Sequence, residues 1–154
     1  MERKFNIKNI QLDTVHRIRQ KFEIAEDIFE QDLSFDHYQT EISLLTAINE
    51  KSSMLRLRLA TLLKGQSKSN EPFPVTGDFC FDFHFKVKQL KNFATIENNE
   101  LILDHEMMRI LSSISYSTSR GFIMNETDKS GILPCAILPI IDPSELLTGR
   151  VTSK

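Results

Sequence analysis

The chain has 154 residues, 40% of them hydrophobic, and a formal net charge of −2 at pH 7. This length supports one domain with a modest core. Acidic and basic residues are interspersed, so the sequence offers no basic patch for nucleic acid. The two cysteines, Cys80 and Cys135, are too few for a disulfide framework and form no CxxC motif, which indicates a reducing, cytoplasmic location.

The sequence gives no indication of insertion into a membrane. The N-terminus lacks the apolar stretch of a secretory signal. The longest apolar run, residues 132–141, is interrupted by Pro134 and Pro139 and is too short to span a bilayer. We therefore expect no membrane insertion.

The first part of the chain predicts an irregular strand. Apolar residues from Phe5 to Ile18 recur at mixed spacings of two and three, which favours a strand with an irregularity and leaves a helix open. Residues 21–33 then combine apolar side chains with five acids, a pattern that fits a bulged loop as well as a short amphipathic helix. The secondary structure of residues 21–34 therefore stays open.

A regular β-hairpin is predicted next. Apolar or threonine side chains alternate with polar ones over residues 38–48, and residues 49–53 form a polar turn. Leucines then alternate with basic residues over residues 55–64, which predicts the antiparallel partner strand. Residues 65–77 are rich in serine, asparagine and proline, and they predict a loop.

The most informative segment is the strand predicted over residues 79–87. Its two faces differ sharply, because side chains in strict period two are aromatic on one face and polar or charged on the other. The simplest interpretation of the aromatic face is burial under a helix, although a core and a binding groove can share such residues. The first face holds Phe79, Phe81, Phe83 and Phe85, and the second holds Cys80, Asp82, His84, Lys86 and Lys88.

One long helix is predicted after this strand. Apolar residues recur at a spacing of about three and a half from Leu103 onward. Asp104 and Glu106 suit the start of a helix, and Gly121, just after Arg120, is expected to be its C-cap. The serines of residues 112–119 indicate a face that packs closely against a neighbour rather than a set of nucleophiles.

The order of the elements predicts the fold class. Strands in series are followed by the helix, by a Pro-containing crossover over residues 137–143 and by a short final segment, residues 144–147. We therefore expect an α+β fold, a four-stranded antiparallel sheet with one long helix and a Pro-containing crossover. So much apolar strand surface without a catalytic motif favours a protein that binds other chains over an enzyme.

This pattern resembles SecB-like proteins, the export chaperones that hold unfolded preproteins. The likeness covers residues 5–147 and depends on the four-strand antiparallel run, on the helix that ends on Ser119, Arg120 and Gly121, and on the crossover. Residues 1–154 are accordingly expected to form a single domain of a divergent SecB-like member.

The resemblance implies an ATP-independent holdase in protein export that binds non-native polypeptides along apolar grooves and needs no cofactor. It also implies a homotetramer, a dimer of dimers in which the long helices meet, with Ile110, Ile114 and Ser117 at the oligomer interface. Asp82 matches one of the acidic positions through which the family contacts the SecA motor. The expected client groove comprises Tyr38, Ile42, Leu44, Phe81, Phe83, Phe85, Met107, Leu138 and Ile140.

The sequence departs from the family at the first strand. The family carries further motor-contacting acids there, whereas this chain offers Asp13 beside the basic residues Arg17 and Arg19. Some SecB-like proteins instead serve as dedicated chaperones of antitoxins in toxin-antitoxin systems, and that alternative stays open. A third alternative is a cup that binds an apolar small molecule between sheet and helix.

A metal site or an active site has little support in the sequence. Cys80, Asp82 and His84 are ligand types for zinc and lie on one strand face, but same-face neighbours on a strand are about 7 Å apart, so all three would strain to reach one ion. No GxSxG, P-loop or Rossmann glycine pattern is present. We therefore expect no metal, no cofactor and no enzymatic activity.

Overall fold

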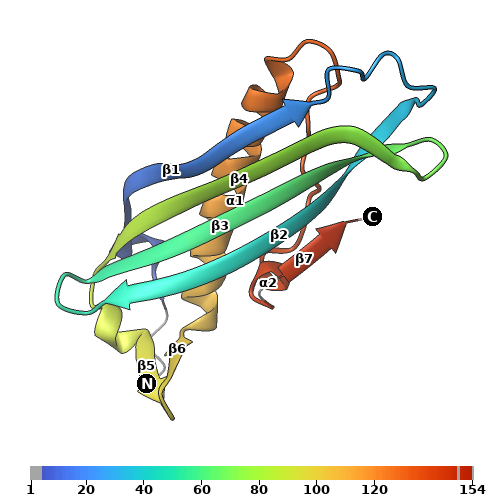
Figure 1. The fold of residues 1–154 in the computed structure, drawn as a ribbon. Coiled ribbons are helices and arrows are strands. Elements are labelled where there is room, and N and C mark those ends of the chain that lie inside the picture. Colours follow the sequence, from blue (N-terminus) through green and yellow to red (C-terminus); the bar gives the residue numbers. More distant parts are fainter. Residues whose placement is uncertain (1–4, 149, 154) are drawn as a thin grey trace.

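A five-stranded antiparallel sheet dominates the structure (Figure 1). The structure is a computed structural model that describes residues 5–148 and 150–153. The strand order is β1-β4-β3-β2-β7, so the expected four strands are joined by a fifth at the edge of β2. The strands are β1 (Ile10–Ile24), β2 (Phe35–Asn49), β3 (Met54–Ser67), β4 (Pro72–Val87) and β7 (Arg150–Ser153).

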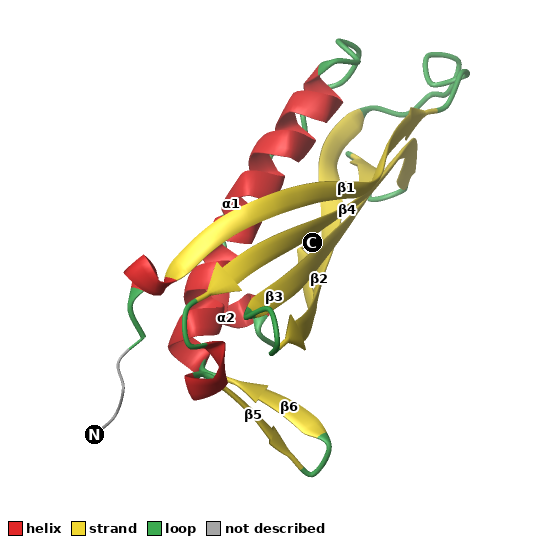
Figure 2. Ribbon diagram, turned by 90° about the vertical axis from the view of Figure 1, so that its left-hand side faces the viewer, coloured by secondary structure: helices red, strands yellow, loops and turns green. Residues whose placement is uncertain are grey.

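One long helix, α1, lies against one face of the sheet (Figure 2). The opposite face, called the outer face below, is covered by no helix of the described residues (Figures 1 and 2). None of the described helices is long and apolar enough to cross a membrane. The elements beside the sheet are the 3-10 turns Ile7–Asn9 and Leu90–Asn92, the hairpin of β5 (Ala94–Glu97) and β6 (Glu100–Leu103), α1 (His105–Asp128) and α2 (Pro143–Leu146).

The predicted β-hairpin is confirmed. Strands β2 and β3 pair in the register that places Ile42 opposite Thr61 and Leu44 opposite Leu59. The same alternation directs four leucines of β3 and four phenylalanines of β4 toward α1, where they form the main core: Leu55, Leu57, Leu59, Leu63, Phe79, Phe81, Phe83 and Phe85. One face of each strand is therefore apolar because it is buried under the helix.

The predicted irregularity of the first strand is also confirmed. Strand β1 contains two breaks in its pairing with β4, between Leu12 and Thr14 and between Arg17 and Arg19. Residues 21–24, whose structure the sequence left open, complete β1, and the following residues form turns. Within these turns Ile28 is buried in a small second core with residues of β4.

The loop predicted over residues 65–77 is wrong. Strand β3 continues to Ser67 and β4 begins at Pro72, so the connection is a tight turn in which Asn70 has a positive φ of 59°. A Cβ at Gly65 would collide with the Val75 side chain, and one at Gly77 would lie 2.7 Å from the Phe79 ring. Both glycines therefore permit close packing inside strands, rather than marking turns.

The predicted end of the helix is wrong as well. Helix α1 passes through Gly121 and continues to Asp128, and Gly131 beyond it has the left-handed φ of 61°. The predicted start is close, because Asp104 is the N-cap and its side chain accepts a hydrogen bond of 2.8 Å from the Met107 amide. Gly121 is exposed and a Cβ there would meet no atom within 4 Å.

The serine-rich part of α1 packs closely on the sheet, as predicted. Its inward serines are fully buried and make no side-chain hydrogen bond in the structure. Their small volume lets the helix approach the phenylalanine face of β4, and the Phe122 ring meets the Phe81 ring at 5.3 Å. The buried serines are Ser112, Ser115 and Ser119.

Candidate functional site

Most of the residues predicted to form a client groove lie in the core. Six of these side chains are no more than 1% exposed, so no client side chain reaches them in this structure. Leu44 is half-buried and Ile140, on the crossover, is 88% exposed. The six buried residues are Ile42, Phe81, Phe83, Phe85, Met107 and Leu138.

Side chains of the sheet and of α1 hydrogen-bond to the backbone of the crossover that follows α1. Tyr38 of β2 donates a hydrogen bond of 2.8 Å to the Pro134 carbonyl, and Tyr116 of α1 donates one of 2.7 Å to the Pro139 carbonyl. The Arg120 Nε also donates to the Leu138 carbonyl at 3.1 Å. Burial raises the pKa of both tyrosines to about 12, so they stay neutral donors at physiological pH.

Removing the Tyr116 hydroxyl is expected to loosen the crossover. The Pro139 carbonyl loses its donor in Tyr116→Phe, and we expect the free energy of unfolding to fall by about 1 kcal/mol. Hydrogen exchange read by mass spectrometry should show faster exchange in residues 136–142 and unchanged exchange in β3. Uniformly faster exchange along the chain would contradict this local role.

A cavity of about 270 Å³, lined mainly by leucines, opens on the helix side of the sheet. It lies where the end of β2, the β5–β6 hairpin, the first turns of α1 and α2 converge. Five of its eight lining residues are leucines, and Thr46 and His105 are exposed lining residues. The lining residues are Leu44, Thr46, Leu101, Leu103, His105, Met108, Leu146 and Leu147.

The edge of β2 beside this cavity is unpaired. Strand β7 pairs only with Thr40–Ser43, and no other described strand joins that side of β2. The edge from Leu44 to Asn49 therefore presents free backbone groups next to the cavity that Leu44 and Thr46 line. An extended polypeptide can hydrogen-bond to such an edge while its alternate side chains enter a pocket.

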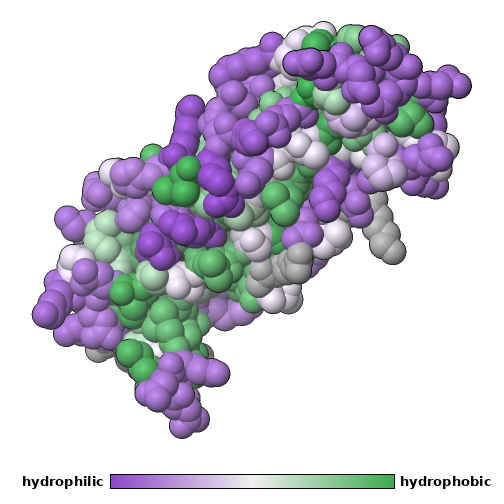
Figure 3. Space-filling view, in the orientation of Figure 1, coloured by the Kyte–Doolittle hydropathy of each residue, from purple (hydrophilic) through white to green (hydrophobic). Residues whose placement is uncertain are grey.

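Exposed apolar side chains continue the cavity onto the hairpin. Ile96 pairs with Leu101 across the hairpin and is 64% exposed, whereas Ile102 lies on the opposite face of the hairpin. Figure 3 shows hydrophobic side chains gathered at the end of the sheet next to the β5–β6 hairpin, whereas hydrophobic and hydrophilic ones are mixed in the middle of the outer face. We call the cavity, the free β2 edge and the hairpin together the β2-edge groove.

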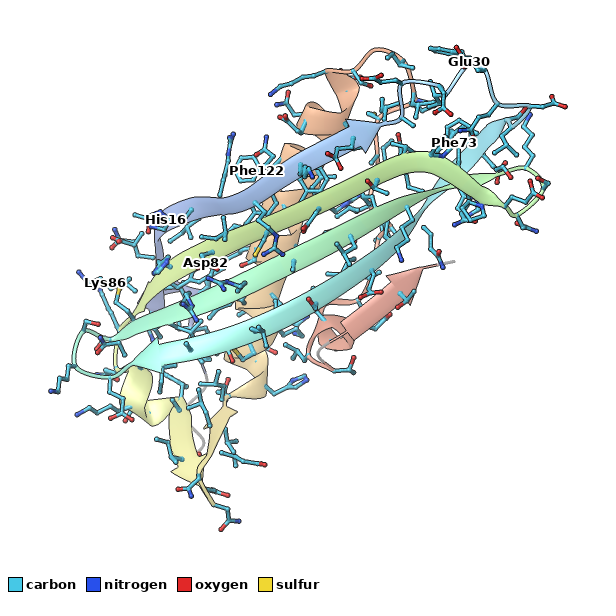
Figure 4. All side chains as sticks on the ribbon, viewed as in Figure 1. His16, Glu30, Phe73, Asp82, Lys86 and Phe122 are labelled. Carbon is cyan, nitrogen blue, oxygen red and sulfur yellow. The ribbon has the colours of Figure 1, made fainter. Side chains whose placement is uncertain are left out.

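Asp82 lies on the outer face but is not available as an acidic contact. Asp82 is labelled in Figure 4; it is 4% exposed, and its two side-chain oxygens accept hydrogen bonds of 2.6 and 2.7 Å from Arg58. The hydrogen bonds from Arg58 hold the pKa of Asp82 below its ordinary value. Within the part of the chain that the structure describes, no three His, Cys, Asp or Glu side chains gather as a metal site.

The Asp82–Arg58 pair is expected to make stability depend on acidic pH. Because the folded pKa is lowered, the stabilisation is fully present above the unfolded value of about 3.9 and is lost as the pH falls through the folded value. Asp82→Asn should lower the free energy of unfolding by about 2 kcal/mol at neutral pH and by less in acid. Urea unfolding against pH measures this, and the exposed Asp13→Asn serves as the control; equal losses for both would contradict it.

The residues predicted for an oligomer interface lie on α1 with different exposure. Ile110 and Ile114 are half-buried and Ser117 is exposed. Ile114 also packs against the main core, so part of its surface serves the fold itself. Their role in assembly stays a prediction.

Comparison with known proteins adds information on the fold. No protein-family model and no curated protein matches the chain. A solved structure, the Mycobacterium tuberculosis Rv1957 SecB-like chaperone in complex with a ChAD peptide from the Rv1956 HigA1 antitoxin, superposes with a TM-score of 0.58. The two chains are 16% identical over 87% of this chain and 91% of the other. This chain shares a distant SecB-like fold.

A second solved structure is less similar. The protein of unknown function from Streptococcus agalactiae has a TM-score of 0.41 and 9% identity, over 85% of this chain and 97% of the other. That degree of overlap says nothing about the site.

Most of the β2-edge groove was missed from the sequence. The hairpin that contributes Leu101 and Leu103 turns at Asn98 and Asn99, whose φ angles of 52° and 64° are both left-handed. Two adjacent asparagines are a known signal for such a turn, and they could have revealed the hairpin. The contribution of Leu146 and Leu147 depends on the tertiary position of α2, for which the sequence carries no local signal.

Proposed function

We propose that the protein is an ATP-independent chaperone that holds extended, apolar segments of non-native polypeptides in the β2-edge groove. The observation that carries the proposal is the free edge of β2 from Leu44 to Asn49 beside a leucine-lined cavity. The edge supplies backbone hydrogen bonds that do not depend on sequence, and the cavity favours apolar side chains of any shape. The SecB-like fold supports the same function.

The energetics fit a holding function without nucleotide. Removing apolar surface from water is worth about 25 cal/mol per Å², so one client leucine in the cavity gains about 2 kcal/mol. Several such contacts along one client add up, because each bound segment raises the local concentration of the next. A protein that binds only the unfolded client shifts the equilibrium by mass action alone, with no catalytic step.

Light scattering tests the holdase activity. A chemically denatured model protein is diluted into buffer with and without near-stoichiometric amounts of the chain, and no nucleotide is added. Suppressed aggregation of several unrelated clients supports the proposal. Unchanged scattering for all of them contradicts general holding. In that case native mass spectrometry of the purified protein tests the small-molecule alternative. A bound apolar ligand would favour it.

A dedicated antitoxin client is the second candidate. The structural neighbour Rv1957 was solved with an antitoxin peptide, and this similarity in fold is what supports the second candidate. A dedicated client would be bound far more tightly than unrelated unfolded proteins. Competition between a candidate antitoxin, encoded beside this gene, and a generic unfolded protein therefore separates the two candidates.

Export and assembly belong to the same proposal. Delivery of clients to a SecA motor needs a docking surface other than Asp82, because that carboxylate is engaged by Arg58.

A homotetramer assembled through α1 would align several grooves for one client. Analytical ultracentrifugation of the wild-type chain and of Ser117→Arg tests the helix contact; identical masses for both would contradict it.

A further inference from the structure

A second pocket lies on the outer face, across the sheet from α1. It has a volume of about 370 Å³ and sits at the end of the β2–β3 hairpin. Its apolar wall comes from Ala47 and Met54, and its polar wall includes Arg56 and His84, which face each other across β3 and β4. This pocket shares residues 47–49 of the β2 edge with the β2-edge groove, but it opens on the outer face, whereas the cavity of the groove opens on the helix side.

Arg56 has an unsatisfied hydrogen-bond donor in this pocket. Its Nε is buried and finds no hydrogen-bond acceptor within the described residues. The positive charge of Arg56 lowers the pKa of Asp82 on the neighbouring strand, but both Asp82 side-chain oxygens accept their hydrogen bonds from Arg58. Because this donor is buried and unsatisfied, an acceptor that reaches it gains a hydrogen bond that the described residues do not supply, so the site can accept an anion.

The side chains around Arg56 favour a carboxylate as the bound anion. A guanidinium with an unsatisfied Nε suits a carboxylate, which it can bind through two parallel hydrogen bonds. His16 meets His84 edge-on at 5.1 Å, and Lys86 also lies on the outer face (Figure 4). Lys86, two residues from His84 on the same face of β4, adds positive charge near Arg56, which favours an anion there.

A polypeptide fits better than a free small acid. Leu45, on the same face of β2 as Ala47, is 66% exposed, and it offers an apolar contact beside the charged pocket. We propose that this outer-face pocket binds the carboxylate of an acidic residue in a polypeptide segment, with an apolar neighbour of that residue lying over Leu45. The site would recognise an acidic partner, distinct from the apolar client in the β2-edge groove.

Fluorescence anisotropy with a labelled peptide in which glutamate and leucine alternate tests the proposal. Arg56→Gln should weaken binding about tenfold or more, because a charge-assisted hydrogen-bonded pair is lost. Lys64→Gln removes the same charge farther along β3 and should change the affinity less than about twofold. Arg56→Lys keeps the charge but loses the planar fork, so it should fall between them.

Controls separate this site from the client groove. A peptide with glutamine in place of glutamate should bind wild type and Arg56→Gln equally, and Thr46→Glu in the β2-edge groove should leave the acidic peptide bound. Equal weakening by Arg56→Gln and Lys64→Gln, or loss through Thr46→Glu alone, would overturn the proposal. Displacement of the peptide by glutarate at the same carboxylate concentration would overturn its assignment to a polypeptide.

Discussion

Replacing Phe83 by alanine is expected to lower the free energy of unfolding by about 4 kcal/mol, because a fully buried ring leaves a cavity in the main core. Phe83 lies in the middle of β4 between Val15 of β1 and Leu57 of β3, and its ring is 6.5 Å from that of Phe85. Urea unfolding followed by circular dichroism measures the loss. The result separates a core role from a role in client binding.

The matched control for Phe83→Ala lies on the same strand. Thr76 is exposed, so Thr76→Ala should change the free energy of unfolding by less than about 0.5 kcal/mol. A loss below about 1 kcal/mol in Phe83→Ala would contradict burial of the phenylalanine face under α1. The aromatic face would then be available to clients, as one interpretation of the sequence allowed.

Charging Thr46 is expected to abolish most of the holding activity without unfolding the protein. Thr46 is exposed and lines the cavity of the β2-edge groove, so a glutamate there must lose water when an apolar segment covers it. The amount of chain needed for half-suppression of client aggregation should rise about tenfold or more. Light scattering measures this amount, and the unfolding midpoint shows that the fold is intact.

The control for Thr46→Glu is Thr76→Glu. Both positions are exposed threonines on strands, but Thr76 lies on β4 away from the cavity. We expect Thr76→Glu to shift half-suppression by less than about twofold, since a solvated surface charge changes little. An equal effect of the two substitutions would show that clients bind elsewhere.

The hairpin and the long helix could be predicted from the sequence because their signals are local. Alternation over residues 38–48 and 55–64 set both the faces and the pairing of β2 and β3. The predictions at Gly65, Gly77 and Gly121 failed for a common reason. Glycine there serves packing or is simply tolerated within an element, whereas the sequence pattern was interpreted as turn or cap chemistry.

The candidate site was less predictable than the fold. Phe81 and its neighbours show alternation, but alternation alone does not separate a buried face from a binding face. The groove is formed where β2, the β5–β6 hairpin and α2 meet, and β7 leaves part of the β2 edge unpaired. Such a junction depends on long-range packing, so only Leu44 of the predicted groove residues lines the cavity.

The most direct test of the account is photo-crosslinking from the groove. A photoreactive phenylalanine derivative placed at Thr46, and separately at Thr76, is irradiated in the presence of an unfolded client and of the same client in its folded form. The account predicts a crosslink from position 46 to the unfolded client only, and none from position 76. Crosslinks from both positions alike, or none from position 46 while aggregation is still suppressed, would contradict a client site in the β2-edge groove.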